Sequence, residues 1–167
     1  MPFTLLRLSV KQLQQLAILR VPAELAPRLV ANALPPSFVA ARALALLAKG
    51  VPERWSTPFL IVRRSDERIV GSCGFKNAPH DGRIEIGYGV AETCTGQGAA
   101  TAAVKQLVAL AIGAGLKALA EVNPENLAST RVVQKAAFRQ IGSRIDVDGE
   151  HLVQWLATDN QSVTASP

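Results

Sequence analysis

Short runs of apolar residues, several of them alternating with polar ones, recur along the chain and predict strands. Turn-forming residues separate these runs, and their shortness is typical of strands rather than of helices. The last two runs flank Asp148-Gly149, a dipeptide typical of a tight two-residue hairpin. The predicted strands cover residues 3–9, 59–64, 68–75, 83–90, 116–122, 138–147 and 150–157.

Between these strands, apolar residues repeat with the three- and four-residue spacing of helices. A long Ala-rich segment opens at Gly96-Gln97-Gly98 and runs to about Ile112. Ser37 is the expected N-cap of a helix over residues 38–49, directly after the break at Pro35-Pro36. The other predicted helices cover residues 11–19, 23–33 and 126–136.

The order of these elements predicts an α/β (α+β) fold, with a mixed, mostly antiparallel central sheet flanked by helices. The strands that end at Val90 and Val122 are expected to be parallel, because a helix joins them as a crossover connection. A single domain over residues 1–157 is expected, since the chain is long enough for one good core. The polar residues 158–167 are expected to form a disordered tail.

The stretch around Gly96-Gln97-Gly98 has the features of an anion site. A strand ends near Val90, a short polar loop follows, and the glycines open the Ala-rich helix. The first-turn N–H groups of a helix lack intrahelical partners, and the helix dipole adds about half a positive charge there. Glycine also lets a phosphate approach the backbone closely. We therefore expect a phosphorylated ligand on this loop.

Two other phosphate-binding motifs were compared with this loop. A P-loop is excluded, because no Gly-Lys-Ser/Thr follows the second glycine. A dinucleotide-binding unit is a closer alternative. Gly96-x-Gly98-x-x-Thr101 lacks only the last glycine, and Glu121 ends the next strand where a ribose-binding acid is expected. Against it, residues 91–95 separate the strand from the glycines, and a long segment precedes the unit.

Several motifs keep the order and spacing of a known family. They are Glu85-Ile-Gly-Tyr88, Gly96-x-Gly98-x-Ala-Thr101 with Ala103-Val104, and Asn126-x-x-Ser129 with Lys135 and Phe138. On these residues the chain resembles the GNAT superfamily of acyl-CoA-dependent N-acetyltransferases. More narrowly, it resembles the branch that includes the ribosomal-protein N-terminal acetyltransferases. The resemblance covers about residues 55–157 and implies the GNAT acyl-CoA N-acyltransferase fold.

Three positions depart from the family pattern. Thr93 stands where the pyrophosphate motif usually begins with Arg or Gln, so the loop loses a side-chain donor. Val133 stands where many relatives carry a Tyr, and Ala137 stands where a Gly commonly precedes the Phe. If the backbone at Ala137 needs a positive φ, alanine costs about 1 kcal/mol there.

The resemblance implies acetyl-CoA as cosubstrate and assigns residues to hold it. Val90 is expected to bond the pantetheine arm through its backbone, in an opening where the strands ending at Val90 and Val122 splay apart. Asn126 is expected to bond the cofactor with its side chain, a role compatible with capping the next helix. The expected loop contacts are Thr95, Gly96, Gln97, Gly98, Ala99, Ala100 and Thr101.

Acyl transfer from a thioester to an amine needs a neutral amine and a proton for the leaving thiolate. Glu85 shares a strand face with Gly87 and Gly89, which leaves room for an amine beside it, so Glu85 is the candidate general base. A structural ion pair with an arginine such as Arg83 is its alternative role. In the matching branch, a serine at the position of Ser129 can protonate the thiolate. An ordinary capping or packing hydroxyl is the alternative for Ser129.

Composition narrows the choice of partner. The net charge of +5 suits an anionic ligand, and the basic residues are scattered without interleaved aromatics, which argues against nucleic acid. Two cysteines and two histidines make neither a disulfide framework nor a metal cluster, so no metal site is expected. The longest apolar run, residues 43–48, is too short to span a bilayer, and a cytoplasmic location without a membrane partner is expected.

Together these features predict an acetyl-CoA-dependent N-acetyltransferase that acts by direct attack in a ternary complex. The acceptor is expected to be a primary amine of a small molecule or of a protein or peptide N-terminus. One alternative is a non-catalytic acyl-CoA-binding or interaction module. The other is a nicotinamide-dependent oxidoreductase, which predicts that Glu121 faces a ribose. Dimers are common among relatives, so a homodimer is a further expectation from the resemblance.

Overall fold

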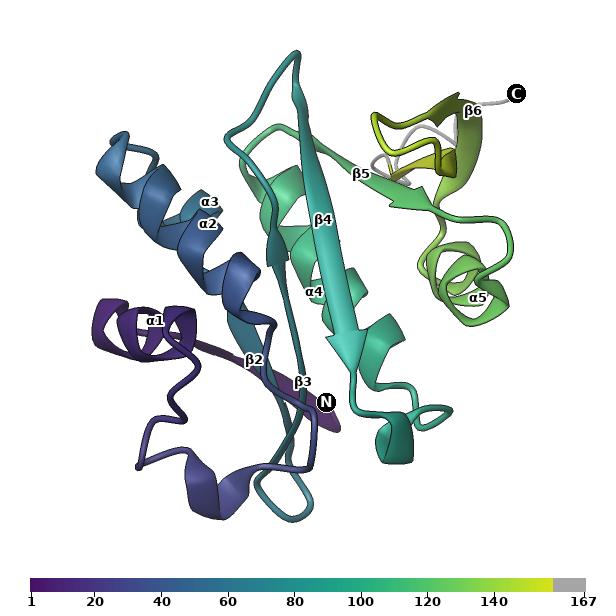
Figure 1. Ribbon diagram of the computed structural model, residues 1–167. Helices are drawn as coiled ribbons and strands as arrows, with labels where there is room; N and C mark the ends of the chain where they lie inside the picture. The colour runs from purple at the N-terminus through teal and green to yellow at the C-terminus, as the bar shows by residue number, and fades with distance from the viewer. Residues whose placement is uncertain (158–167) are drawn as a thin grey trace.

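A seven-stranded sheet forms the centre of the computed structural model, which describes residues 1–157 (Figure 1). The strand order is β1-β2-β3-β4-β5-β7-β6, and every neighbouring pair is antiparallel except β4 and β5. The mixed, mostly antiparallel fold predicted from the sequence is confirmed. The expected tail over 158–167 lies outside the described residues. The strands are Phe3–Arg7 (β1), Phe59–Arg63 (β2), Arg68–Phe75 (β3), Arg83–Val90 (β4), Lys117–Val122 (β5), Arg139–Ile145 (β6) and His151–Ala157 (β7).

Helices lie against both halves of this sheet. The longest, α4, contacts all five strands from β1 to β5, and α5 packs on α4 and β5. Figure 1 shows α4 passing behind β4, with α1 and α2 side by side near the N-terminal strands. The helices are Val10–Ala17 (α1), Ser37–Ala48 (α2), Glu53–Ser56 (α3), Ala99–Gly113 (α4) and Leu127–Lys135 (α5), with 3-10 turns at Ala26–Arg28 (η1) and Glu92–Cys94 (η2).

The packing of α4 follows from its alanines. Ala99, Ala103, Leu107 and Ala111 are buried and recur every four residues, so they form one stripe along the helix. Small side chains in this stripe bring the helix axis close to the sheet. Because the sheet fixes α4 along its length, the first turn of the helix is held at the end of β4.

Two local predictions from the sequence are wrong, and one short helix was missed. The helix expected over residues 23–33 is only the 3-10 turn η1, because Pro27 lies inside the segment and the Val30 N–H donates to Ile69 of β3 at 3.0 Å. Pro36, not Ser37, occupies the N-cap of α2, and no side chain caps that helix. The short helix α3 was not predicted.

The turn between β6 and β7 is also longer than the predicted two-residue hairpin. β6 ends at Ile145 and β7 begins at His151. The Asp146 carboxylate explains the wider loop, because it accepts the backbone N–H groups of Asp148 and Glu150, each at 2.9 Å.

The parallel strands β4 and β5 separate after a short contact. Their register joins Arg83 to Lys117 and Glu85 to Leu119, and no pairing between them continues beyond Glu85 within the described residues. β4 runs on to Val90 and β5 to Val122, and Figure 1 shows the two arrows pointing apart. The splay expected between these strands is therefore present, and it leaves one edge of the β4 end without a neighbouring strand.

Candidate active site

A cavity of about 420 Å³ lies between the end of β4, the first turn of α4 and the first turns of α5. We call it the α4 cavity. Every site residue predicted from the sequence lines it, with two exceptions, Glu85 and Gln97. The predicted residues that line it are Val90, Thr95, Gly96, Gly98, Ala99, Ala100, Thr101, Asn126 and Ser129.

The loop presents a row of free backbone donors to this cavity. Gly96 and Gly98 have φ values of 77° and 85°, a left-handed backbone that glycine adopts without strain. The first bond of α4 joins the Ala102 N–H to the Gly98 carbonyl at 3.0 Å. Among residues 1–157, the N–H groups from Gly96 to Thr101 have no hydrogen-bond partner. These donors and the helix dipole make this end of the cavity suited to a phosphate group.

Two loop residues differ from the rest in how they are held. The Thr95 N–H donates to the Glu92 carbonyl at 3.3 Å, and the Thr95 hydroxyl donates to the same oxygen at 2.8 Å. The Gln97 side chain accepts a hydrogen bond from Arg63 of β2 at 2.8 Å. Thr95 and Gln97 therefore fix the shape of the loop, and the free donors begin at Gly96.

The backbone at the end of β4 points its polar groups into the opening beside β5. The Glu85 carbonyl accepts from Lys76, and the Ala91 N–H donates to Val70, so the odd-numbered residues of β4 bond to β3. The N–H and C=O groups of Tyr88 and Val90 consequently face the other side, where β5 has moved away. This geometry suits the backbone role that the resemblance implies for Val90.

Asn126 caps α5 and keeps a donor free. Its Oδ1 accepts the Ser129 N–H at 3.0 Å, as an N-cap side chain does. The Asn126 Nδ2 has no partner among the described residues, and the side chain lines the α4 cavity. The cationic side chains of Arg131 and Lys135 line the same wall. This wall of the cavity can therefore donate to an anionic ligand.

Two hydroxyl groups meet between β4 and α5. The Tyr88 hydroxyl lies 2.6 Å from the Ser129 Oγ, and it also reaches the Ser129 carbonyl at 3.3 Å. Burial raises the pKa of Tyr88 above its ordinary value, and the hydrogen bond with Ser129 partly offsets this. Tyr88 belongs to the motif Glu85-Ile-Gly-Tyr88, but no chemical role was predicted for it from the sequence. Its status as the chain's one tyrosine was the available signal.

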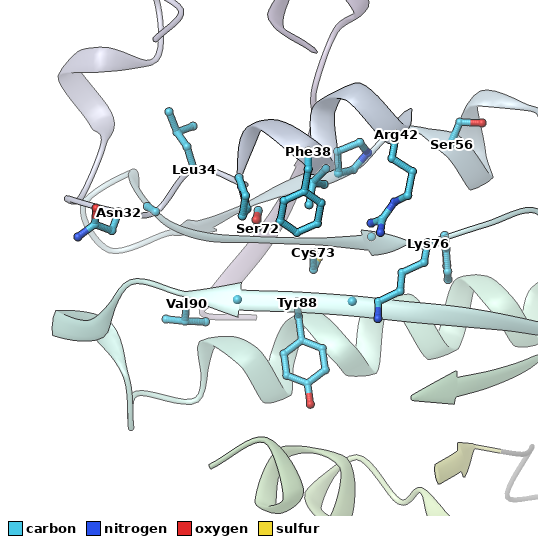
Figure 2. A pocket seen from close by; sticks show the side chains of 18 residues that line it. Asn32, Leu34, Phe38, Arg42, Ser56, Ser72, Cys73, Lys76, Tyr88 and Val90 are labelled. Atoms are coloured by element: carbon cyan, nitrogen blue, oxygen red, sulfur yellow. The ribbon is translucent and has the colours of Figure 1, made fainter. Parts of the chain in front are cut away.

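A second cavity of about 440 Å³ opens on the other face of β4, under α2, and we call it the α2 cavity. It shares Tyr88, Gly89 and Val90 with the α4 cavity, so the two cavities meet at the end of β4. Figure 2 shows Phe38 and Arg42 pointing from α2 toward the sheet, and the Tyr88 ring pointing away from this cavity.

Glu85 lies on the face of β4 that α2 covers, where it forms an ion pair. Its Oε1 is 3.0 Å from the Lys76 Nζ, and the two side chains are 21% and 35% exposed. The Lys76 side chain crosses Gly87, where an added Cβ would lie 3.1 Å from its Cε. The pairing with Arg83 that was considered from the sequence is wrong, because Lys76 takes that place. The role of Glu85 as a base stays a prediction.

The Val133 position holds no substitute acid. Val133 is fully buried in the core on the inner side of α5. Among the described residues, Tyr88 is the only hydroxyl-bearing residue that lines both cavities, and its hydroxyl contacts Ser129.

The thiol that lines the α2 cavity is held in its protonated form. Cys73 lines the α2 cavity, but burial raises the pKa of its thiol to about 12, so the thiol is protonated at neutral pH. No cluster of three or more metal-ligating side chains occurs within residues 1–157.

Every helix in that part of the chain is too short or too polar to cross a membrane.

The dinucleotide alternative is wrong. It requires the Glu121 carboxylate to face a ribose, but Glu121 pairs with Arg144 of β6, whose Nη2 lies 3.0 Å from the Glu121 Oε1. The Glu121 side chain is only 7% exposed. The mostly antiparallel sheet also differs from the parallel sheet of a dinucleotide-binding fold.

Comparison with known proteins agrees with this geometry. A family profile described as an acetyltransferase (GNAT) domain matches residues 22–139. The uncharacterized N-acetyltransferase p20 of Bacillus licheniformis is 34% identical over 104 residues, which span 58% of this chain and 54% of that protein. The chain thus matches about half the length of this curated relative.

Two solved structures share the fold at low identity. The ribosomal-protein-S5-alanine acetyltransferase of Vibrio fischeri is 15% identical with a TM-score of 0.66, and the match covers 96% of this chain and 95% of that one. AAC(6′)-Ib in complex with parmomycin and acetyl-CoA is 21% identical with a TM-score of 0.67, and the match covers 99% of both chains. The chain belongs to the GNAT acetyltransferase family.

Proposed function

We propose that residues 1–157 act as one N-acetyltransferase domain that transfers an acetyl group from acetyl-CoA to a primary amine. The observation that carries this proposal is the meeting of the two cavities at Tyr88, Gly89 and Val90. A thioester held in the α4 cavity would present its carbonyl carbon there to an amine held in the α2 cavity. Direct attack in a ternary complex follows from this arrangement.

The α4 cavity supplies the contacts that acetyl-CoA needs. The free N–H groups from Gly96 to Thr101 suit the pyrophosphate, and the open β4 edge at Val90 suits the amide-bearing pantetheine arm. The Asn126 Nδ2 is placed to donate a further hydrogen bond. Holding both reactants in one geometry is the main contribution to rate that this site offers.

The bond changes balance without a covalent enzyme intermediate. The amine nitrogen bonds to the thioester carbon, the carbon–sulfur bond breaks, and the thiolate takes a proton. Ser129 is the proposed donor of that proton, and Tyr88 lies in hydrogen-bond contact with it at 2.6 Å. The amine loses its proton through water, with the Glu85 carboxylate as the proposed acceptor.

Calorimetric titration of the protein with acetyl-CoA is the first test, with a nicotinamide dinucleotide as the control ligand. Acetyl-CoA should bind with a micromolar dissociation constant and the dinucleotide should not bind. Release of the CoA thiol should then be followed with a panel of small amines and peptide N-termini. Binding of acetyl-CoA without thiol release for any amine would favour the non-catalytic acyl-CoA-binding module instead.

The proposed base has its own test. Glu85→Gln keeps the shape of the side chain and removes its basicity, so turnover should fall if the carboxylate accepts the proton. Turnover at the wild-type rate in this variant would remove Glu85 from the mechanism. The homodimer and the cytoplasmic location expected from the sequence stay predictions. Light scattering on the purified protein would check the first of them.

A further inference from the structure

The α2 cavity is lined by cations and lacks a free carboxylate among the described residues. Its charged lining side chains are Arg42 of α2 and Lys76, which follows β3. The carboxylate whose charge acts on Arg42, Glu85, is already held by Lys76 at 3.0 Å. Two positive charges and one negative charge therefore leave an excess of one positive charge, which belongs to Arg42.

Arg42 has no partner for its guanidinium within residues 1–157. None of the hydrogen bonds or ion pairs found there involves its side chain, although the residue is half-buried. Burial lowers the pKa of Arg42, and the more distant charge of Glu85 offsets only part of this. A partly desolvated guanidinium without a hydrogen-bonded anion is costly. An anion from outside the chain would satisfy it.

The geometry connects Arg42 to the proposed reaction centre. Phe38 and Arg42 lie four residues apart on α2, so they project from the same side of the helix, and Figure 2 shows both over the cavity. The cavity extends from these side chains to Gly89 and Val90 at the end of β4. One ligand can therefore place an anionic group at Arg42 and an amine at the end of β4.

We propose that the acetyl acceptor is a small primary amine that carries an anionic group, a carboxylate or a phosphate, which Arg42 binds. This inference rests on the function proposed above and specifies its acceptor. A cavity of about 440 Å³ has the size of a small-molecule site. The apolar side chains of Leu34, Phe38 and Val39 would cover the body of such a ligand.

The excess positive charge of Arg42 also affects which amines the cavity accepts. Polyamines carry further cationic groups that would lie against Arg42 without an anion to compensate them. The site should therefore discriminate against polyamines by repulsion and favour amines with an anion by attraction.

Matched pairs of amines test this inference. Leucine and leucinamide differ in the carboxylate, and phosphoethanolamine and ethanolamine differ in the phosphate, so the two pairs separate the two anion sources. Rates are compared per neutral amine, because the anionic group also raises the pKa of the amine. Spermidine serves as the polycationic acceptor. The kcat/KM for thiol release should favour the anionic member of at least one pair roughly tenfold or more, with spermidine poorest.

Variants at Arg42 test whether its guanidinium causes the preference for anionic amines. Arg42→Gln should bring the ratio within the favoured pair close to one, chiefly by raising KM for the anionic member, and Arg42→Lys should keep part of the preference. Arg20→Gln removes the same charge from an exposed position after α1 and should leave the ratio unchanged. A calorimetric titration of leucine and phosphoethanolamine into the CoA-loaded protein adds a readout that is independent of turnover.

The possible results separate this inference from the proposed function. Equal kcat/KM within both pairs, a preference for spermidine, or a preference that survives Arg42→Gln would overturn the anionic acceptor and leave the acetyltransferase proposal standing. If no amine is acetylated but an anionic amine binds and Arg42→Gln abolishes that binding, the site assignment holds and the catalytic proposal fails. Absence of both turnover and binding would overturn the inference.

Discussion

Among single residues, Tyr88 and Ser129 have the most direct consequence for the chemistry. Their oxygens lie 2.6 Å apart, and both residues line the α4 cavity, so one proton can be shared between them. Ser129→Ala and Tyr88→Phe should each lower kcat, roughly 10- to 100-fold for a group that assists proton transfer. Because the pair acts as a unit, the double variant should be little slower than the slower single one. Steady-state thiol release measures all three.

The pH profile of the wild-type protein and the additivity of the two substitutions separate chemistry from packing. Burial raises the pKa of Tyr88, so its hydroxyl keeps its proton to higher pH than an ordinary tyrosine. The wild-type kcat should therefore show no loss attributable to Tyr88 at neutral or mildly alkaline pH. Full additivity of the two substitutions, or wild-type kcat in Ser129→Ala, would mean that these hydroxyls only pack against one another.

The backbone at Ala137 has a positive φ, the case in which the sequence analysis expected a cost for alanine. Its φ is 64°, and the Phe138 N–H donates to the Val133 carbonyl, so α5 ends in a left-handed cap that favours glycine. Ala137→Gly should raise the free energy of unfolding by about 1 kcal/mol. Urea denaturation measures it. Ala109→Gly, an exposed position inside α4, should lower stability by about as much, and a fall in both variants would contradict the strain at Ala137.

At the scale of elements, the loop that opens α4 should determine affinity for acetyl-CoA. Gly98 has a φ of 85° and borders the α4 cavity, and an added Cβ there would meet open space in the free protein. Gly98→Ala should strain the loop and place a methyl group where the ligand approaches. We expect its dissociation constant for acetyl-CoA to rise roughly tenfold or more, because several N–H donors lose alignment together.

Gly115 provides a matched control for that substitution. It has a φ of 76° and open space around a Cβ, but it follows α4 at the opposite end of the helix from the loop. Gly115→Ala should cost about 1 kcal/mol of stability through the same backbone strain and leave acetyl-CoA affinity unchanged. Similar affinity losses in the two variants would show that strain alone, and not the loop's contact with the ligand, is being measured.

This loop and the segment from 23 to 33 show which elements could be predicted from the sequence and which could not. The sequence signal for the α4 N-terminus is local, because the strand, the glycines and the Ala-rich helix follow one another along the chain. The structure formed there depends on backbone geometry, which the glycines largely determine. The segment from 23 to 33 is different. Its helical spacing gives way to a bond from Val30 to Ile69, a partner far along the chain. Tertiary contacts of that kind override a weak local preference.

At the scale of the whole molecule, the acceptor side of the site could not be predicted, because it depends on contacts between distant residues. Arg42 and Lys76 come from α2 and the end of β3, and only the fold brings both over β4. The Tyr88–Ser129 contact joins residues 41 positions apart. The cofactor side was predictable because its residues form one continuous motif with a second motif following it. The acceptor side has no such motif.

The connection between the two halves of the sheet predicts that acetyl-CoA stabilises the fold. One half contains β1, β2, β3 and β4, and the other contains β5, β7 and β6. The two halves are linked through the short β4–β5 pairing and through the helices α4 and α5. A ligand in the α4 cavity touches both α4 and α5, so it bridges the halves at the place where their strands part. At a concentration of 100 times its dissociation constant, acetyl-CoA should stabilise the fold by about 2.7 kcal/mol. For a chain of this length, that raises Tm by roughly 5–11 °C.

Hydrogen exchange shows whether this stabilisation comes from bridging. Acetyl-CoA should slow exchange at the N–H groups from Gly96 to Thr101, at the first turn of α5, and at Val90, since all of them border the α4 cavity. Protection should then spread to β5 and β7, because α5 packs on β5 and β7 pairs with it. Protection confined to the loop would mean that acetyl-CoA binds one half only. In that case the opening between β4 and β5 would be a feature of the sheet without a role in binding, and the meeting of the two cavities would lose its functional meaning.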